Sequence, residues 1–166
     1  MMNYFETYDE SLAAVKTNGL NISWVYPDMR SAELCMAAVR QNGRVLSCVP
    51  YDMRSQEICE AALTDAPLAF ASVPNDLKTF EMCLKAVATH SPVLGQVPEK
   101  FRDQTMCELG VGYHGENIRF VPKALKTREM CDMAFRQNAN AIQYIPEGMF
   151  TPDMRAFHNQ LTGWNY

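Results

Sequence analysis

Apolar residues recur three and four positions apart in short segments along the whole chain, which is the spacing of one buried helix face. In the segment that follows Ser31 they are Leu34, Cys35, Ala38 and Val39. Serine commonly caps the N-terminus of a helix. The pattern therefore predicts an amphipathic helix that begins after the serine and ends at the Asn-Gly pair that follows the apolar positions.

Copies of this segment recur along the chain at one constant interval, with no insertion or deletion between them. Self-similarity at such a fixed period is typical of a solenoid of stacked repeats. Side chains that cap helix N-termini fall in one repeat column and predict seven helices. This column contains Thr7, Ser31, Ser55, Thr79, Asp103, Thr127 and Thr151.

The rest of each unit carries apolar residues such as Leu46, Val49 and Met53, again three and four apart. This spacing favours a short second helix or 3-10 turn that starts at or is interrupted by the proline. A strand is the alternative, because R-V-L-S-C-V-P and E-N-I-R-F-V-P are rich in β-branched and aromatic residues. We expect an all-α, right-handed superhelical solenoid of seven 24-residue units. One domain would span residues 1–166, with atypical capping units at 1–19 and 146–166.

The motif A-V-x-x-N-G, followed by V-P-x-x-L-R and a new helix, resembles an uncharacterised bacterial repeat family, a domain of unknown function. The similarity runs from Thr7 to Gly163, and Ala38 to Gly43 is the best copy. The repeat plan is also similar to that of the leucine-rich repeat variant, a right-handed superhelix of alternating α and 3-10 helices. The resemblance implies a helical repeat fold and transfers no catalytic residue.

The composition is that of an ordinary folded protein, with 48% hydrophobic and 20% charged residues. The net charge of -4 gives no global positive field that would attract nucleic acid or an anionic membrane. We find neither a basic, apolar leader nor an apolar run of membrane-spanning length, so we expect a cytoplasmic protein without a membrane segment. Another protein is the partner that this composition favours.

Five cysteines occupy one repeat column, so their spacing reports the repeat and not a disulfide pattern. Zn–S bonds are only about 2.3 Å long, and thiols of successive stacked units are too far apart to share one zinc ion. We therefore expect small buried free thiols, and neither a metal nor a cofactor. The column is Cys35, Cys59, Cys83, Cys107 and Cys131.

His90 and His114 share the repeat column of Asn18, Asn42 and Asn138, where helix C-terminal hydrogen bonding is expected. A small hydrolase-like enzyme that uses the His90/His114 region is the alternative. The sequence supplies no positioned nucleophile with an orienting third group, so we expect that the protein is not an enzyme.

A basic column places one cation in each of five units, and such a ladder can track a phosphate backbone. A glutamate follows three residues later in four of these units, which favours salt bridges over binding of nucleic acid. The basic column is Arg30, Arg54, Lys78, Arg102 and Lys126.

Aromatic side chains dominate binding hot spots, which makes Trp24, Tyr113, His114, Phe120 and Tyr144 our candidates for partner binding. The alternative for Trp24, Phe120 and Tyr144 is that they pack under the short helix. We expect a non-catalytic repeat scaffold that binds one protein partner along a concave surface, as an inhibitor, immunity protein or adaptor.

Overall fold

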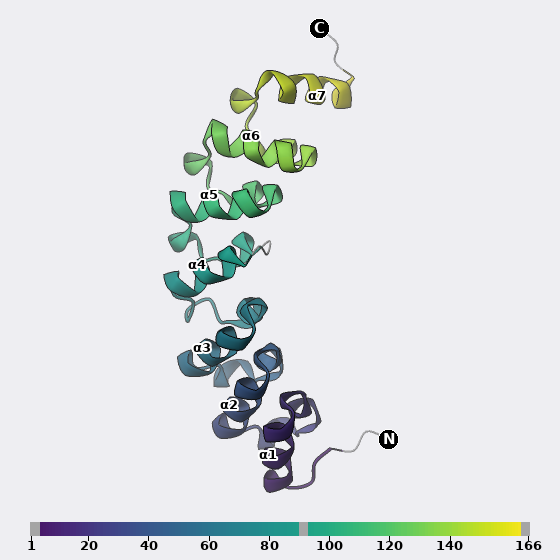
Figure 1. The fold of residues 1–166 in the computed structure, drawn as a ribbon, viewed down its shortest axis with the longest axis vertical. Coiled ribbons are helices and arrows are strands. Elements are labelled where there is room, and N and C mark those ends of the chain that lie inside the picture. The colour runs from purple at the N-terminus through teal and green to yellow at the C-terminus, as the bar shows by residue number, and fades with distance from the viewer. Residues whose placement is uncertain (1–3, 90–92, 164–166) are drawn as a thin grey trace. The chain divides into compact units, whose positions relative to one another are not determined.

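The computed structural model describes residues 4–89 and 93–163, in which α-helices alternate with 3-10 helices and no strand occurs (Figure 1). The all-helical prediction is therefore confirmed, and the strand alternative for the second segment is wrong. The chain divides into two compact units, unit 1 (Met1–Met82) and unit 2 (Cys83–Tyr166). The single domain with capping segments at 1–19 and 146–166 stays a prediction.

Unit 1 holds three complete repeats of one α-helix followed by 3-10 helices. They comprise α1 (Tyr8–Thr17), η1 (Gly19–Trp24), η2 (Pro27–Met29), α2 (Ala32–Gln41), η3 (Gly43–Cys48), η4 (Tyr51–Met53), α3 (Gln56–Asp65) and η5 (Pro67–Ser72). The next helix, α4 (Phe80–Ala88), runs across the boundary between the units.

Unit 2 repeats the plan. It contains η6 (Leu94–Gln96), η7 (Glu99–Phe101), α5 (Gln104–Tyr113), η8 (Gly115–Phe120), η9 (Lys123–Leu125), α6 (Arg128–Gln137), η10 (Ala139–Tyr144), η11 (Glu147–Met149) and α7 (Pro152–Thr162). The starts of the seven α-helices are evenly spaced along the chain, and their spacing is the period of the sequence.

Each α-helix begins directly after a residue of the predicted capping column. Ser31 Oγ accepts a hydrogen bond from the Leu34 N–H at 3.2 Å, and an Asp103 carboxylate oxygen accepts from the Met106 N–H at 2.8 Å. At Thr7 the capping box is complete, since the Glu10 side chain also accepts from the Thr7 N–H. The seven helix starts are thus confirmed, because an N-cap is a local signal that needs no tertiary contact.

The Asn-Gly pair ends the α-helix as predicted, and Asn42 also starts the next helix. Its N–H donates to the Ala38 carbonyl at 2.9 Å, and its side-chain Oδ1 accepts from the Arg44 N–H at 3.1 Å. Asn42 is extended, with φ of -155°, and among the described glycines only Gly163 has a positive φ. The helix end is therefore not the left-handed glycine cap that Asn-Gly usually indicates.

Gly43 is required for a different reason. A Cβ at this position would collide with the carbonyl oxygen of Ala62 in the following repeat. The Gly43 N–H donates to Asp65 Oδ2 at 2.9 Å, and the Gly115 N–H donates to Gln137 Oε1 at 2.8 Å. Each of these glycines therefore lets the backbone of one repeat lie directly on the helix of the next.

The core is built from the small columns that the sequence predicted. All five column cysteines are buried. Ala38, Ala62 and Ala134 have no exposed surface, and Gly110 fills the same column in α5. A Cβ on Gly110 would lie 3.2 Å from a methyl carbon of Leu94, so a small residue allows close helix contact here.

Candidate interaction surface

The arginines of the basic column are bound to backbone carbonyls. Arg54 Nε donates to the Val49 carbonyl at 3.0 Å, and its Nη1 donates to the Ser72 carbonyl of the next repeat at 2.7 Å. Arg30 and Arg102 repeat this arrangement, bonding the carbonyls five residues before them and 18 residues after them. We predicted glutamate partners, and the structure gives the guanidinium groups carbonyl partners instead.

The two lysines of the column are also drawn into the fold. Lys78 is 5% exposed, donates to Asn75 Oδ1 at 2.9 Å and lies 4.6 Å from the centre of the Phe70 ring. Lys126 Nζ donates to the Tyr144 carbonyl at 2.5 Å, and burial lowers the pKa of Lys126. The three arginines and Lys126 thus each bond the carbonyl of the last residue of a 3-10 helix.

The column cysteines have the environment of inert thiols. Burial raises the pKa of Cys35, Cys59 and Cys131, and it raises the pKa of Cys107 to about 11. A thiolate is the reactive form of cysteine, and these groups stay protonated near neutral pH. Cys48 stands outside the column, is half-buried, and lies 3.7 Å from Ser23 Oγ.

Of the two candidate histidines, the structure describes His114. His90 lies outside the described residues. His114 is half-buried at the end of α5, where its backbone N–H donates to the Gly110 carbonyl at 3.0 Å. His114 therefore occupies the predicted helix-end column, through its backbone N–H. In the described ranges, no group of three or more His, Cys, Asp or Glu residues could hold a metal ion.

The five aromatic and histidine candidates for partner binding are divided between the two units. Trp24 belongs to unit 1, and the other four belong to unit 2. Phe120 and Tyr144 end neighbouring helices η8 and η10, whereas Tyr113 and His114 precede η8. Phe120 is half-buried, and its ring occupies the space that a Cβ on Gly95 would need. Phe120 thus packs against the preceding repeat, while Trp24 stays 38% exposed.

A second set of exposed apolar side chains lies in unit 1 and was missed by sequence reasoning. Helix η3 contacts η1 on one side and η5 on the other. Leu20 of η1 is 54% exposed and Leu68 of η5 is 62% exposed. Together with Trp24 these residues form what we call the unit 1 strip. The sequence does indicate this strip, because Leu20 and Leu68 stand in a repeat column that is polar in three other repeats. The polar residues of the column are Arg44, Glu116 and Asn140.

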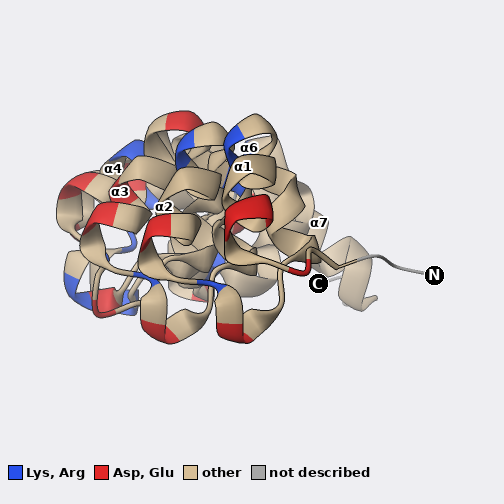
Figure 2. Ribbon diagram, turned by 90° about the horizontal axis from the view of Figure 1, so that it is seen from below, with Lys and Arg blue, Asp and Glu red and all other residues tan. Residues whose placement is uncertain are grey.

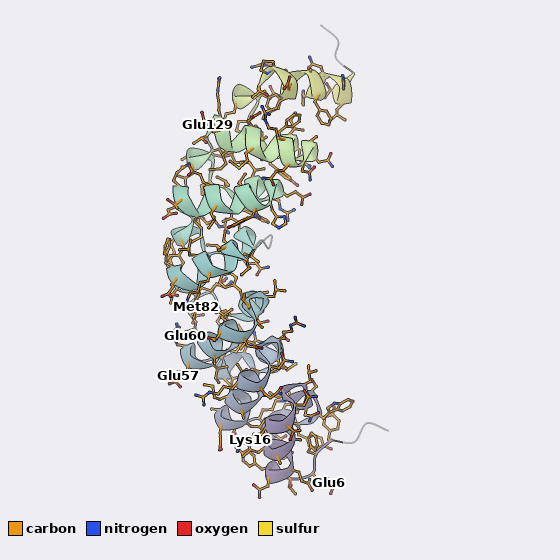
Figure 3. All side chains as sticks on the ribbon, viewed as in Figure 1. Glu6, Lys16, Glu57, Glu60, Met82 and Glu129 are labelled. Atoms are coloured by element: carbon orange, nitrogen blue, oxygen red, sulfur yellow. The ribbon has the colours of Figure 1, made fainter. Side chains whose placement is uncertain are left out.

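Acidic residues accompany the strip. Asp28, Asp52 and Asp76 are exposed, occupy one repeat column that follows η1, η3 and η5, and form what we call the acidic row. Further acids lie on the α-helices, as Figure 2 shows in the first turns of α2 and α3. Glu57 and Glu60 extend to the same side of α3 (Figure 3). Unit 1 holds eleven acidic and six basic residues, a net charge of -5.

Comparison with known proteins adds a partial family match. A family model described as a domain of unknown function (DUF4116) matches residues 11–54, which run from α1 to just beyond η4 in unit 1. No curated protein and no solved structure matches the chain. The chain is therefore an all-helical protein whose first repeats are similar to an uncharacterised domain. The described part of the chain contains no helix that is long and apolar enough to cross a membrane.

Proposed function

We propose that this chain is a non-catalytic repeat scaffold that binds one protein partner, as an inhibitor, an immunity protein or an adaptor in the bacterial cytoplasm. The observation that carries the proposal is the division of labour between repeat columns. Cysteines, alanines and arginines that recur along the repeats are used in packing and carbonyl bonding, whereas exposed positions vary between repeats and include large apolar side chains. Variable exposed positions on a regular framework are what repeat proteins use to bind partners.

The finer architecture belongs to the same proposal. The even spacing of helix starts in both units supports seven repeats that continue as one right-handed superhelical solenoid. Small-angle X-ray scattering of the full chain tests this, because a superhelix has a larger radius of gyration than a compact domain of 166 residues.

Affinity capture tests the partner. The tagged chain is incubated with lysate of its source and of any host, washed at high salt, and the retained proteins are quantified. We expect one protein in stoichiometric amount, and isothermal titration with the purified protein then gives its affinity. If nuclease treatment showed that the retained material was nucleic acid alone, the basic column would be favoured as a nucleic-acid site. This result would contradict the proposal.

The other two functions have specific tests of their own. Arg30, Arg54 and Arg102 donate to carbonyls, which supports a structural role for the basic column rather than phosphate binding. A gel-shift assay with single- and double-stranded nucleic acid measures this directly. For an enzyme, activity would depend on His90 and His114, so a double alanine variant that stays folded and loses a detected activity would favour catalysis.

A further inference from the structure

We propose that the unit 1 strip and the acidic row together dock a basic amphipathic segment of a partner protein. Such a segment carries apolar side chains on one face and Lys or Arg side chains beside them. The inference rests on the proposed function, and it specifies the surface and the chemistry of the partner.

Leu20 and Trp24 lie on η1 and Leu68 lies on η5, the two 3-10 helices that flank η3. Within η1, η3 and η5, Arg44 is the one residue that carries a charge. Ser23 Oγ lies 3.7 Å from Cys48 Sγ, which shows how closely successive 3-10 helices approach. Arg44 is exposed and occupies the same repeat column between Leu20 and Leu68. The strip therefore has apolar side chains on both sides of one cation, and contact with another apolar face would remove these side chains from water.

Unit 2 shows that the fold does not need apolar residues at these positions. The repeat column of Leu20 and Leu68 holds Glu116 in η8 and Asn140 in η10, as it holds Arg44 in η3 of unit 1, and all three are exposed. Helices η3, η8 and η10 are formed with polar residues there. Solvent-exposed leucines in unit 1 are thus unexplained by folding, and exposed apolar patches commonly mark interaction sites.

The acidic row supplies the second half of the chemistry. Asp28 follows Trp24 by four residues, which places it within about 14 Å of this strip residue along the chain. Asp76 follows Leu68 by eight residues. The corresponding column of unit 2 holds Lys100, Ala124 and Gly148, in line with a net charge of +1 there. The net negative charge therefore belongs to the unit that carries the strip, and it attracts a cationic partner.

Two exposed tyrosines come shortly before residues of the acidic row, Tyr26 before Asp28 and Tyr51 before Asp52. Tyr26 is 46% exposed and Tyr51 is 65% exposed. The Tyr26 ring stacks on Tyr4 at 4.5 Å between centroids, and the Tyr51 ring lies 5.6 Å from the Arg54 guanidinium carbon. An exposed tyrosine beside a carboxylate can accept a Lys or Arg side chain by cation–π and ionic attraction together.

Defined peptides test the proposal on the full-length chain. The chain has two tryptophans, so the Trp164→Phe variant leaves Trp24 as a fluorescent reporter within the strip. Two 16-residue helical peptides share one leucine face and carry either Lys or Glu at the other positions. We expect the Lys peptide to bind at about 0.15 M salt and to change the Trp24 emission, and the Glu peptide to show neither effect.

Variants then locate the bound peptide. Leu20→Glu with Leu68→Glu is expected to weaken binding of the Lys peptide at least tenfold, the range of a hot-spot residue. Asp28→Ala with Asp52→Ala and Asp76→Ala is expected to weaken it and to flatten its salt dependence. Asn140→Glu, at the equivalent position of unit 2, is the matched control and is expected to leave binding unchanged. Circular dichroism checks that every variant is folded.

Several results would overturn the inference. They are equal binding of the Lys and Glu peptides, full binding by the strip variant, and equal loss in the Asn140→Glu control. A concentration-dependent dimer that the strip variant abolishes would identify a second copy of the chain as the occupant instead.

Affinity capture with the same variants separates this inference from the proposed function. A protein partner captured equally by the wild type and the strip variant would leave the function standing and reject this surface. Peptide binding without any captured partner would support the surface and reject the function.

Discussion

In unit 1, η1 and η5 expose Leu20 and Leu68 at the repeat position that holds Arg44 in η3, whereas unit 2 has Glu116 and Asn140 there. Inside the two units the contrast disappears, because Cys35 and Cys107 are both fully buried. Arg54 and Arg102 likewise make the same bonds to carbonyls five residues before and 18 residues after them. A repeat protein can thus keep one set of contacts for folding while its surfaces diverge in charge and polarity.

The largest effect is expected where repeats touch through glycine. Gly43→Ala would force a methyl group against the backbone carbonyl of Ala62, which cannot move aside as a flexible side chain could. We expect the free energy of unfolding to fall by about 3 kcal/mol, as for an overpacked core. Urea denaturation followed by circular dichroism measures the change.

The same substitution in unit 2 sharpens the comparison. A Cβ on Gly115 would lie 2.5 Å from the Ala134 carbonyl oxygen, so Gly115→Ala should also be strongly destabilising. A Cβ on Gly148 would meet no atom within 4 Å, which makes Gly148→Ala the control. If Gly115→Ala were as well tolerated as Gly148→Ala, the shared contact geometry of the two units would be refuted.

Removal of one arginine comes next in size. Arg54→Ala leaves the Val49 and Ser72 carbonyls without the charged donor, and we expect a loss of about 2 kcal/mol. Arg102→Ala should cost a similar amount in unit 2. Replacement of the exposed Lys123 by Ala is the control, with a change within about 0.5 kcal/mol. The denaturant midpoints of the three variants measure these differences in stability. An unchanged midpoint for Arg54→Ala would contradict the role of Arg54 in bonding the carbonyls.

A stabilising change is expected at Asn117, where the repeats on either side have Val93 and Ala141. Asn117 is buried, its Nδ2 donates to the Gly110 carbonyl at 2.8 Å, and its Oδ1 has no partner among the described residues. Val45 and Val93 occupy the same repeat column. Asn117→Val should therefore raise the free energy of unfolding by about 1 kcal/mol, since a buried unsatisfied oxygen is removed.

Unit 1 supplies the control for this prediction. Asn21 is half-buried in the same column, and its Nδ2 donates to the Ala14 carbonyl at 2.9 Å. Because it is closer to water, Asn21→Val is expected to give no gain. A thermal melt in which Asn117→Val lowered the melting temperature would show that its hydrogen bond outweighs the unpaired oxygen.

The smallest effect concerns alkaline pH. Burial raises the pKa of Cys107 from 9.0 to about 11, so the folded state holds a proton that the unfolded state loses in this interval. The stabilisation from this thiol is complete below pH 9 and is lost as the pH rises through about 11. Cys107→Ala should therefore show a shallower decline of stability between these limits, measured by denaturation at several pH values. Cys48→Ala is the control, and an unchanged slope in Cys107→Ala would count against the assignment.

Local signals explain what could be predicted. The capping residues and the repeat period located every α-helix, because both are written in neighbouring residues. The carbonyl partners of Arg54 were missed because the sequence offers a glutamate three residues later as an obvious ionic partner. Every residue has a backbone carbonyl, so the sequence does not single out the one 18 residues away. The need for Gly43 was missed because it arises from the next repeat. The exposed leucines of unit 1 could have been found by comparing columns for polarity.

The bonds between repeats also restrict how the length of the chain can change. Arg54 reaches a carbonyl 18 residues ahead, and Gly43 reaches a side chain 22 residues ahead. Insertion of one residue between such partners would leave a guanidinium or an amide without its acceptor. Insertion or removal of one whole repeat would restore every pairing. Chains of this kind are therefore expected to grow and shrink by complete repeats, and the number of copies becomes the heritable variable.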